Sequence, residues 1–150
     1  MSKFGTRLAG AGGFINISQN ARKVVFVGTF TAGALQVAVA DGRLRIERDG
    51  AATKFVEAVE HRTFSGPQAI KWQRDVLYVT ERCVFRLGQE GLELIEIAPG
   101  VDLQRDILDR MDFVPVMKRP PALMDARIFA DAPMGLRRDL LDIPLEQRLS

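Results

Sequence analysis

Residues 23–30 have the sequence Lys-Val-Val-Phe-Val-Gly-Thr-Phe, in which β-branched and aromatic side chains follow one another without polar alternation. Such a run is typical of a strand that is buried on both faces, as in a sheet covered by helices. Residues 76–80, Val-Leu-Tyr-Val-Thr, have the same character. We therefore expect these two segments to lie at the centre of an α/β domain.

The segment between these two strands predicts an antiparallel β insertion. Residues 35–39 and 44–48 alternate apolar and polar side chains, and Asp41-Gly42 between them favours a hairpin turn. We expect the insertion to continue to about Phe64. Ser65-Gly66-Pro67 then interrupts the pattern, and a short helix is expected at residues 68–73.

The second half of the chain predicts two more strands, a helix and a tail. The strands are expected at residues 84–87 and 92–97, with a turn between them. Asp102 is suited to cap a helix whose apolar face contains Leu103, Ile107, Leu108 and Met111. Five of the seven prolines lie between Pro115 and Pro144. We therefore expect a domain over residues 1–113 and a proline-rich tail over residues 114–150, packed on that domain, with a short helix near residues 136–141.

The composition is that of an ordinary globular protein. The chain has 150 residues, 47% of them hydrophobic and 27% charged, with a formal net charge of +2. Its basic residues are scattered or paired, which does not favour a nucleic-acid partner. No apolar run approaches the length of a membrane span, and the first residues lack the apolar core of a secretion signal. We expect a cytoplasmic protein without a membrane partner.

Glycines are concentrated at the start of the chain, where residues 8–17 have the sequence Leu-Ala-Gly-Ala-Gly-Gly-Phe-Ile-Asn-Ile. Glycine lets backbone N–H groups approach a bound group closely, so such a cluster suits an oxyanion or a phosphate. It is not the dinucleotide-binding fingerprint, because Ile15 stands at the third glycine position, and no Gly-Lys-Ser/Thr of a P-loop follows. From the residues alone, a tight turn packed on the sheet explains the cluster equally well.

Longer stretches of the chain resemble family I CoA-transferases, and in particular the propionate and acetate CoA-transferases of the acyl-CoA:acetate/3-ketoacid type. The similar stretches are residues 2–33, 59–66, 76–87, 91–108 and 123–129. The resemblance implies an α/β fold with an open, largely parallel sheet that belongs to the C-terminal part of the catalytic β-type domain. It also implies short-chain acyl-CoA donors and carboxylate acceptors, as in ketone body and short-chain fatty acid metabolism.

In that family a glutamate of a Glu-x-Gly-x-x-Gly motif attacks the acyl-CoA and forms a glutamyl-CoA thioester. A Gly-x-Gly-Gly-Phe motif binds the oxyanion, and residues 10–14 match it at every fixed position. The resemblance therefore assigns the oxyanion hole to the backbone N–H groups of Gly10, Gly12 and Gly13. It also implies substrate or CoA contacts at Phe14, Thr29 and Thr31. Coenzyme A is then a substrate, and neither a separate cofactor nor a metal is expected.

The nucleophile of that family has no counterpart in this sequence. No glutamate begins a Glu-x-Gly-x-x-Gly motif, and no acidic residue precedes Gly10. We therefore expect the C-terminal portion of a CoA-transferase, inactive alone, whose nucleophile belongs to a missing N-terminal half or a complementing subunit. The alternative is a catalytically inactive remnant domain with a structural or weak CoA-binding role. A homo-oligomer is expected in either case.

Three further residues have structural interpretations that we favour. Glu81 follows a predicted strand, where functional groups gather in open sheets, but we expect it to pair with Arg82 or another cation. Cys83 is expected to be a small buried side chain and not a nucleophile. His61 is the chain's only histidine and has no cluster of metal ligands around it.

Overall fold

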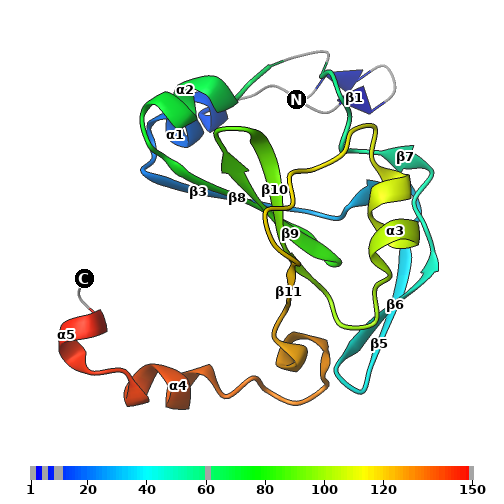
Figure 1. Cartoon of the computed structure of the whole chain (residues 1–150), viewed down its shortest axis with the longest axis vertical. Coiled ribbons are helices and arrows are strands. Elements are labelled where there is room, and N and C mark those ends of the chain that lie inside the picture. Colours follow the sequence, from blue (N-terminus) through cyan, green and yellow to red (C-terminus); the bar gives the residue numbers. More distant parts are fainter. Residues whose placement is uncertain (1–2, 5–6, 9–11, 60–61, 149–150) are drawn as a thin grey trace.

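A five-stranded mixed sheet forms the centre of the protein in the computed structural model, which describes residues 3–4, 7–8, 12–59 and 62–148 (Figure 1). The strands, in their order across the sheet, are β11 (Ala122–Leu123), β10 (Gly91–Ile97), β9 (Cys83–Gly88), β8 (Asp75–Val79) and β3 (Lys23–Val27). β3 is parallel to β8 and β11 is parallel to β10, whereas β9 is antiparallel to both of its neighbours. Four of the five strands thus run in one direction, as the expected α/β class requires.

β3 is the edge strand of this sheet, and its burial differs from the prediction. Val24 is buried, but Val25 and Val27 on the opposite face are 47% and 79% exposed. The expectation that residues 23–30 are buried on both faces was therefore wrong. The physical reason is position: β8 covers one edge of β3, and no described element packs against the face that carries Val25 and Val27.

Two short helices cover the other face of β3 and β8. They are α1 (Phe14–Asn20) and α2 (Gly66–Lys71), and between them and the sheet lies a small core of Val24, Ala69 and Val76 (Figure 1). The Ser65 hydroxyl accepts a hydrogen bond from the Gln68 N–H at 3.3 Å and so caps α2. The predicted helix is confirmed, two residues earlier than expected, because proline fits the first turn of a helix.

The antiparallel insertion forms two small pairs of strands. β4 (Thr31–Ala32) pairs with β7 (Ala52–Thr53), and β5 (Gln36–Ala40) pairs with β6 (Arg43–Arg48). Asp41 and Gly42 both have positive φ, 53° and 71°, as a tight hairpin turn requires. The predicted hairpin is confirmed, but regular pairing stops at Thr53 and not near Phe64. A further antiparallel pair joins β1 (Lys3–Phe4) and β2 (Arg7–Leu8).

The main core lies where β9 and β10 meet the helices that follow them. It consists of Phe30, Cys83, Phe85, Leu94 and Ile107. Asp102 caps α3 (Leu103–Asp106), with its side chain accepting from the Arg105 N–H at 2.8 Å, as the sequence predicts. Ile107 interrupts the helix, and the chain continues as the 3-10 helix η1 (Leu108–Arg110). All four apolar residues predicted for this face pack into or against the core.

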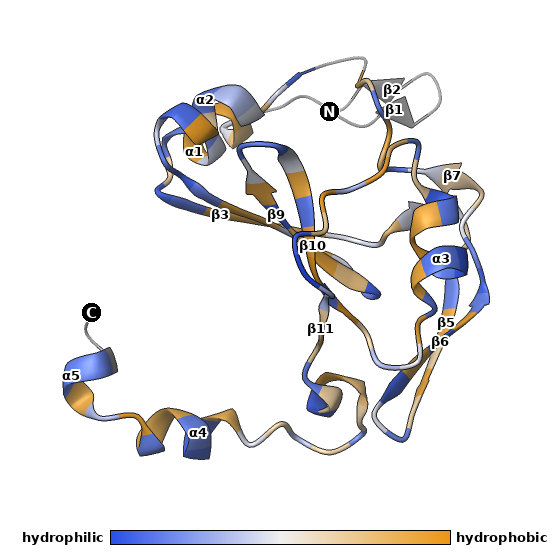
Figure 2. Ribbon diagram, viewed as in Figure 1, coloured by the Kyte–Doolittle hydropathy of each residue, from blue (hydrophilic) through white to orange (hydrophobic). Residues whose placement is uncertain are grey.

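The C-terminal segment contributes one strand that the sequence analysis missed. β11 pairs with Glu96 and Ile97 of β10, and Met124 and Phe129 are buried against Leu44. The 3-10 helix η2 (Ala126–Phe129) follows, and then α4 (Leu136–Asp142) and α5 (Leu145–Arg148) lead away from the sheet (Figure 1). The helix expected near residues 136–141 is confirmed, and Figure 2 shows hydrophobic residues on both terminal helices. The division of the chain at residue 113 stays a prediction.

Candidate active site

The glycine motif lies at the beginning of α1. Gly12 has a φ of +50°, in the left-handed region that favours glycine, and a Cβ atom at this position would meet nothing within 4 Å. Gly13, which has no side chain, is the N-cap of α1. Both glycines are exposed, whereas Gly10 lies outside the described residues. Gly12 therefore combines a special backbone conformation with open space around it.

Phe14 connects this motif to the sheet. Its ring lies 5.9 Å from the ring of Phe26 on β3, centroid to centroid, and the side chain is 42% exposed. Phe26 stacks in turn on Tyr78 of β8, with a centroid distance of 5.0 Å. A row of aromatic rings thus runs from the glycine motif across the two parallel strands.

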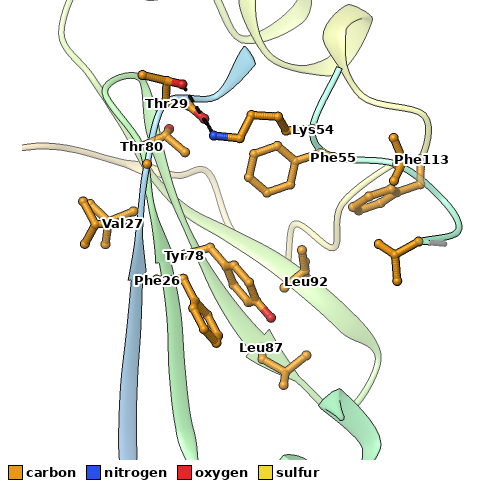
Figure 3. Close-up of a pocket in the computed structure, with 14 residues that line it drawn as sticks. Phe26, Val27, Thr29, Lys54, Phe55, Tyr78, Thr80, Leu87, Leu92 and Phe113 are labelled. Atoms are coloured by element: carbon orange, nitrogen blue, oxygen red, sulfur yellow. Dashed lines mark hydrogen bonds between the residues drawn. The ribbon is translucent and has the colours of Figure 1, made fainter. Parts of the chain in front are cut away.

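A cavity of about 380 Å³ opens above this aromatic row (Figure 3). Phe26 and Tyr78 lie on its sheet side, and Phe55 and Phe113 lie opposite them. Its other labelled lining residues are Val27, Thr29, Lys54, Thr80, Leu87 and Leu92. The cavity lies beside the carboxyl ends of β3 and β8, where open α/β sheets bind ligands.

Lys54 and Thr29 supply polar groups at the rim of this cavity. The Lys54 ammonium donates to the backbone carbonyl oxygen of Thr29 and lies 3.5 Å from its hydroxyl oxygen. The Thr29 hydroxyl donates to the carbonyl oxygen of Thr31 at 2.7 Å. Of the two threonines predicted to contact substrate, Thr29 is exposed and lines the cavity. The role of Lys54 was not anticipated, because it lies in the irregular segment after β7.

Thr31 has a different environment, because it is buried with 3% of its surface exposed. Its hydroxyl donates to Asp49 Oδ1 at 2.7 Å and accepts from the Gly50 N–H at 3.0 Å. The hydroxyl group is thus used within the protein, and Thr31, although it contacts Thr29, does not line the cavity.

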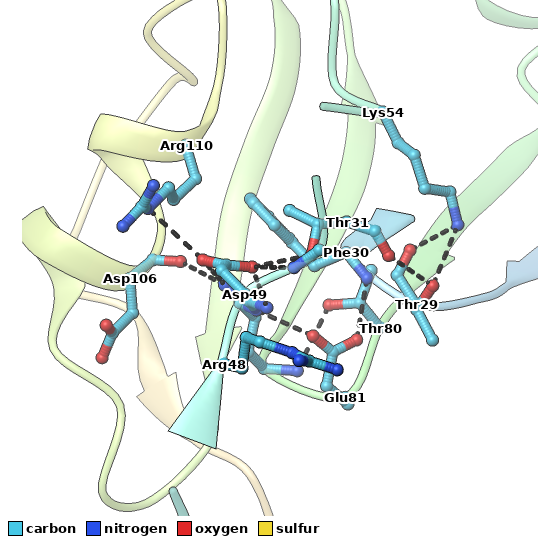
Figure 4. A network of polar contacts seen from close by, with 12 residues as sticks. Thr29, Phe30, Thr31, Arg48, Asp49, Lys54, Thr80, Glu81, Asp106 and Arg110 are labelled. Carbon is cyan, nitrogen blue, oxygen red and sulfur yellow. Dashed lines mark hydrogen bonds and ion pairs between the residues drawn. The ribbon is translucent and has the colours of Figure 1, made fainter. Parts of the chain in front are cut away.

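Asp49 and Thr31 belong to a polar network that also contains Glu81 (Figure 4). Asp49 and Glu81 both accept hydrogen bonds from the guanidinium of Arg82. The Arg82 side chain has no exposed surface, and its guanidinium lies 2.7 Å from Glu81 Oε1 and 3.0 Å from Asp49 Oδ1. It also donates to the backbone carbonyl oxygen of Asp106 at 2.9 Å and lies over the ring of Phe30. Glu81 Oε2 accepts from the Phe30 N–H at 2.8 Å. The expected pairing of Glu81 with Arg82 is confirmed.

The network shifts the pKa values of both Asp49 and Arg82 toward their charged forms. Burial alone would raise the pKa of Asp49, but hydrogen bonds from Arg82 and Thr31 outweigh it and the pKa falls below 3.8. Burial alone would lower the pKa of Arg82, whereas its hydrogen bonds to Asp49 and Glu81 raise it. Asp49 and Arg82 are therefore both charged, and the network links the β insertion to the start of β9 and to α3.

Cys83 is buried as predicted, with no exposed surface. Burial raises the pKa of its thiol to about 12, and the Thr80 hydroxyl lies 3.4 Å from its sulfur. A thiol with such a pKa is uncharged at neutral pH, so Cys83 is unsuited to nucleophilic attack.

Among the described residues, no three or more histidine, cysteine, aspartate or glutamate side chains form a group that could hold a metal ion. None of the helices among them has the length and apolar character needed to cross a membrane. His61 lies outside the described residues.

Comparison with known proteins identifies relatives over part of their length. No family model matches the chain. It is 53% identical over 133 residues to the acetate CoA-transferase YdiF of Escherichia coli O157:H7, covering 89% of the chain and 25% of that protein. It is 48% identical over 132 residues to the caffeate CoA-transferase of Acetobacterium woodii, again covering 25% of that protein. The chain thus spans about a quarter of the length of the curated relatives that it matches.

A solved structure agrees with the fold. The crystal structure of the E. coli O157:H7 acyl-CoA transferase YdiF, in a thioester complex with CoA, matches with a TM-score of 0.85 and 53% identity. The match covers 89% of this chain and 26% of that chain.

Proposed function

From the premise that this chain is homologous to about a quarter of the CoA-transferase polypeptide, we propose that it is the C-terminal, oxyanion-binding portion of an acyl-CoA:carboxylate CoA-transferase. The observation that carries the proposal is the motif at residues 10–14, in a chain that is 53% identical over 133 residues to an acetate CoA-transferase. The exposed Gly12, with its positive φ, supports it because such a backbone can present N–H groups without side-chain obstruction.

In the proposed reaction each transfer step passes through a tetrahedral oxyanion. Backbone N–H groups of Gly10, Gly12 and Gly13 stabilise that charge, and one such donor is typically worth about 2.7–4 kcal/mol of the barrier. Phe14 and Thr29 contact the substrate, and Thr31 acts through the hydrogen bonds that hold the loop near Gly50. The attacking glutamate comes from a segment not represented here, as no glutamate of this sequence begins the required motif.

A chimeric enzyme tests this proposal. This chain replaces the homologous quarter of the E. coli acetate CoA-transferase, and CoA transfer from acyl-CoA is measured with acetate and with larger carboxylic acids as acceptors. We expect an active chimera that Gly12→Ala slows by about 10²-fold or more, because strain at a positive φ displaces the N–H donors. Gly135→Ala is the matched control, since Gly135 also has a positive φ and open space around it.

The same chimera addresses the alternative of an inactive remnant. A chimera that folds, as judged by its circular dichroism and size, but transfers no CoA would favour the remnant with a structural or weak CoA-binding role. Equal activity of the Gly12→Ala and Gly135→Ala variants would instead reject the oxyanion role of the motif.

A further inference from the structure

The cavity between β3, β8 and residues 54–56 has the composition of a binding site for one small anion with an apolar body. Of the fourteen residues that line it, Lys54 alone is charged. The others are mostly aromatic or aliphatic, and the volume of about 380 Å³ lies within the range of small-molecule sites. A two-carbon acid would leave most of this apolar space unfilled.

The charge of Lys54 is available to such a ligand. Its ammonium group bonds only to the two oxygens of Thr29, and no carboxylate among the described residues pairs with it. Both of these partners are neutral and Lys54 is exposed at the rim, so its ammonium group can also pair with a ligand carboxylate there. Hydrogen bonds between an ammonium and a carboxylate are stronger than those between neutral groups.

Tyr78 offers a second polar group, inside the cavity. Its hydroxyl points into the space beside Leu87 and Leu92 (Figure 3), and no hydrogen bond joins it to any described residue. Burial raises the pKa of this hydroxyl, so it stays protonated and able to donate at neutral pH. Its ring stacks on Phe26, which contacts Phe14 of the glycine motif.

We propose that this cavity binds the apolar body of a monocarboxylic acid of arylpropionate size, with the carboxylate at Lys54 and the ring between Phe26 and Phe55. This inference rests on the proposed function, because it assigns to that site a carboxylic acid acceptor that is larger than acetate. The name of the A. woodii relative, a caffeate CoA-transferase, is consistent with an aromatic acid of this size.

The experiment uses the fact that Tyr78 is the only tyrosine of the chain. The full chain is labelled with 3-fluorotyrosine, and its single ¹⁹F resonance is followed during titration with 3-phenylpropionate, acetate and the neutral analogue 3-phenylpropanol. We expect saturable shifts with the two phenyl compounds and none with acetate at the same concentrations. Lys54→Met should weaken 3-phenylpropionate binding about tenfold and leave 3-phenylpropanol binding unchanged.

Lys71→Met, which removes an exposed lysine of α2, is the matched control and should change neither affinity. The proposal is overturned if acetate shifts the resonance as strongly as 3-phenylpropionate, or if Lys54→Met and Lys71→Met behave alike. A free resonance already at its saturated position, which moves on dilution of the protein, would overturn it by assigning the cavity to a second copy of the chain.

The readout is binding and needs no CoA transfer, so the two proposals can fail separately. Binding of 3-phenylpropionate to a chain whose chimera is inactive would leave this inference standing and reject the enzymatic role. An active chimera whose chain does not bind 3-phenylpropionate would reject this inference and leave the proposed function standing.

Discussion

Arg82 is completely buried, and two carboxylates, a carbonyl oxygen and an aromatic ring surround it. Removing a guanidinium from water costs several kcal/mol, which these partners offset only as a complete set. The network is therefore sensitive to the loss of a single member. It connects residues that lie 33 and 24 positions away from Arg82 along the chain.

We predict that Arg82→Met destabilises the chain by about 3–5 kcal/mol, because it leaves Asp49 and Glu81 without their buried partner. The free energy of unfolding in urea measures this effect. Arg45→Met is the control, since its pair with Glu47 is largely exposed and should contribute about 0–1 kcal/mol. Equal losses in the two variants would contradict the structural role given to Arg82.

The lowered pKa of Asp49 predicts that the stability of the folded chain depends on pH. Its pKa is lowered in the folded protein, so the stabilisation it provides is complete above its ordinary value of 3.8 and is lost as the pH falls through the lower folded value. We expect Asp49→Asn to lose less stability than the wild type between pH 6 and pH 3. Urea unfolding at both pH values tests this, with the exposed Asp131→Asn expected to behave like the wild type.

At the scale of elements, short-range signals account for most of what was predicted. The hairpin at Asp41-Gly42, the short helix after Ser65-Gly66-Pro67 and the cap at Asp102 depend on residues within a few positions of each other. β11 was missed because it is two residues long and owes its strand conformation to pairing with β10. The exposure of β3 was missed because hydrophobicity alone does not reveal whether a second layer covers a strand.

Gly50 connects the insertion to the network around Arg82. A Cβ atom here would lie 2.5 Å from the carbonyl oxygen of Ala32 and 2.8 Å from the Thr31 hydroxyl oxygen. We predict that Gly50→Ala destabilises the chain by about 1–3 kcal/mol, because backbone must move to admit the methyl group. Thermal unfolding measures it against Gly88→Ala, where the nearest atom is 3.6 Å away and little change is expected.

At the scale of the whole molecule, no strand of the described residues pairs with the outer side of β3, and one face of this strand exposes Val25 and Val27. Exposed edge strands are templates for pairing with another chain. We predict that the chain self-associates with rising concentration and that Val25→Lys reduces this association, measured by size-exclusion chromatography. Val114→Lys, at a position that is 82% exposed but outside any strand, is the control. A wild-type chain that elutes as a monomer at every concentration would count against the homo-oligomer expected from the sequence.

The absence of the Glu-x-Gly-x-x-Gly motif leads to a second prediction at this scale. We expect the isolated chain to form no covalent adduct with CoA when it is incubated with acyl-CoA, because it lacks the nucleophilic carboxylate. Intact-protein mass spectrometry tests this, with the intact E. coli enzyme as the positive control. A CoA-sized mass increase on one of this chain's glutamates would refute it.

The amino-acid sequence by itself determined the positions of the main strands along the chain, the hairpin, the Asp102 helix cap and the glycine motif, because these features depend on neighbours along the chain. It also predicted the Glu81–Arg82 pair, since the two residues are adjacent. Only the tertiary structure decided that Asp49 completes this pair, that Lys54 and Tyr78 face one cavity, and that Val25 stays exposed. These relations join segments distant in sequence, and packing alone brings them together.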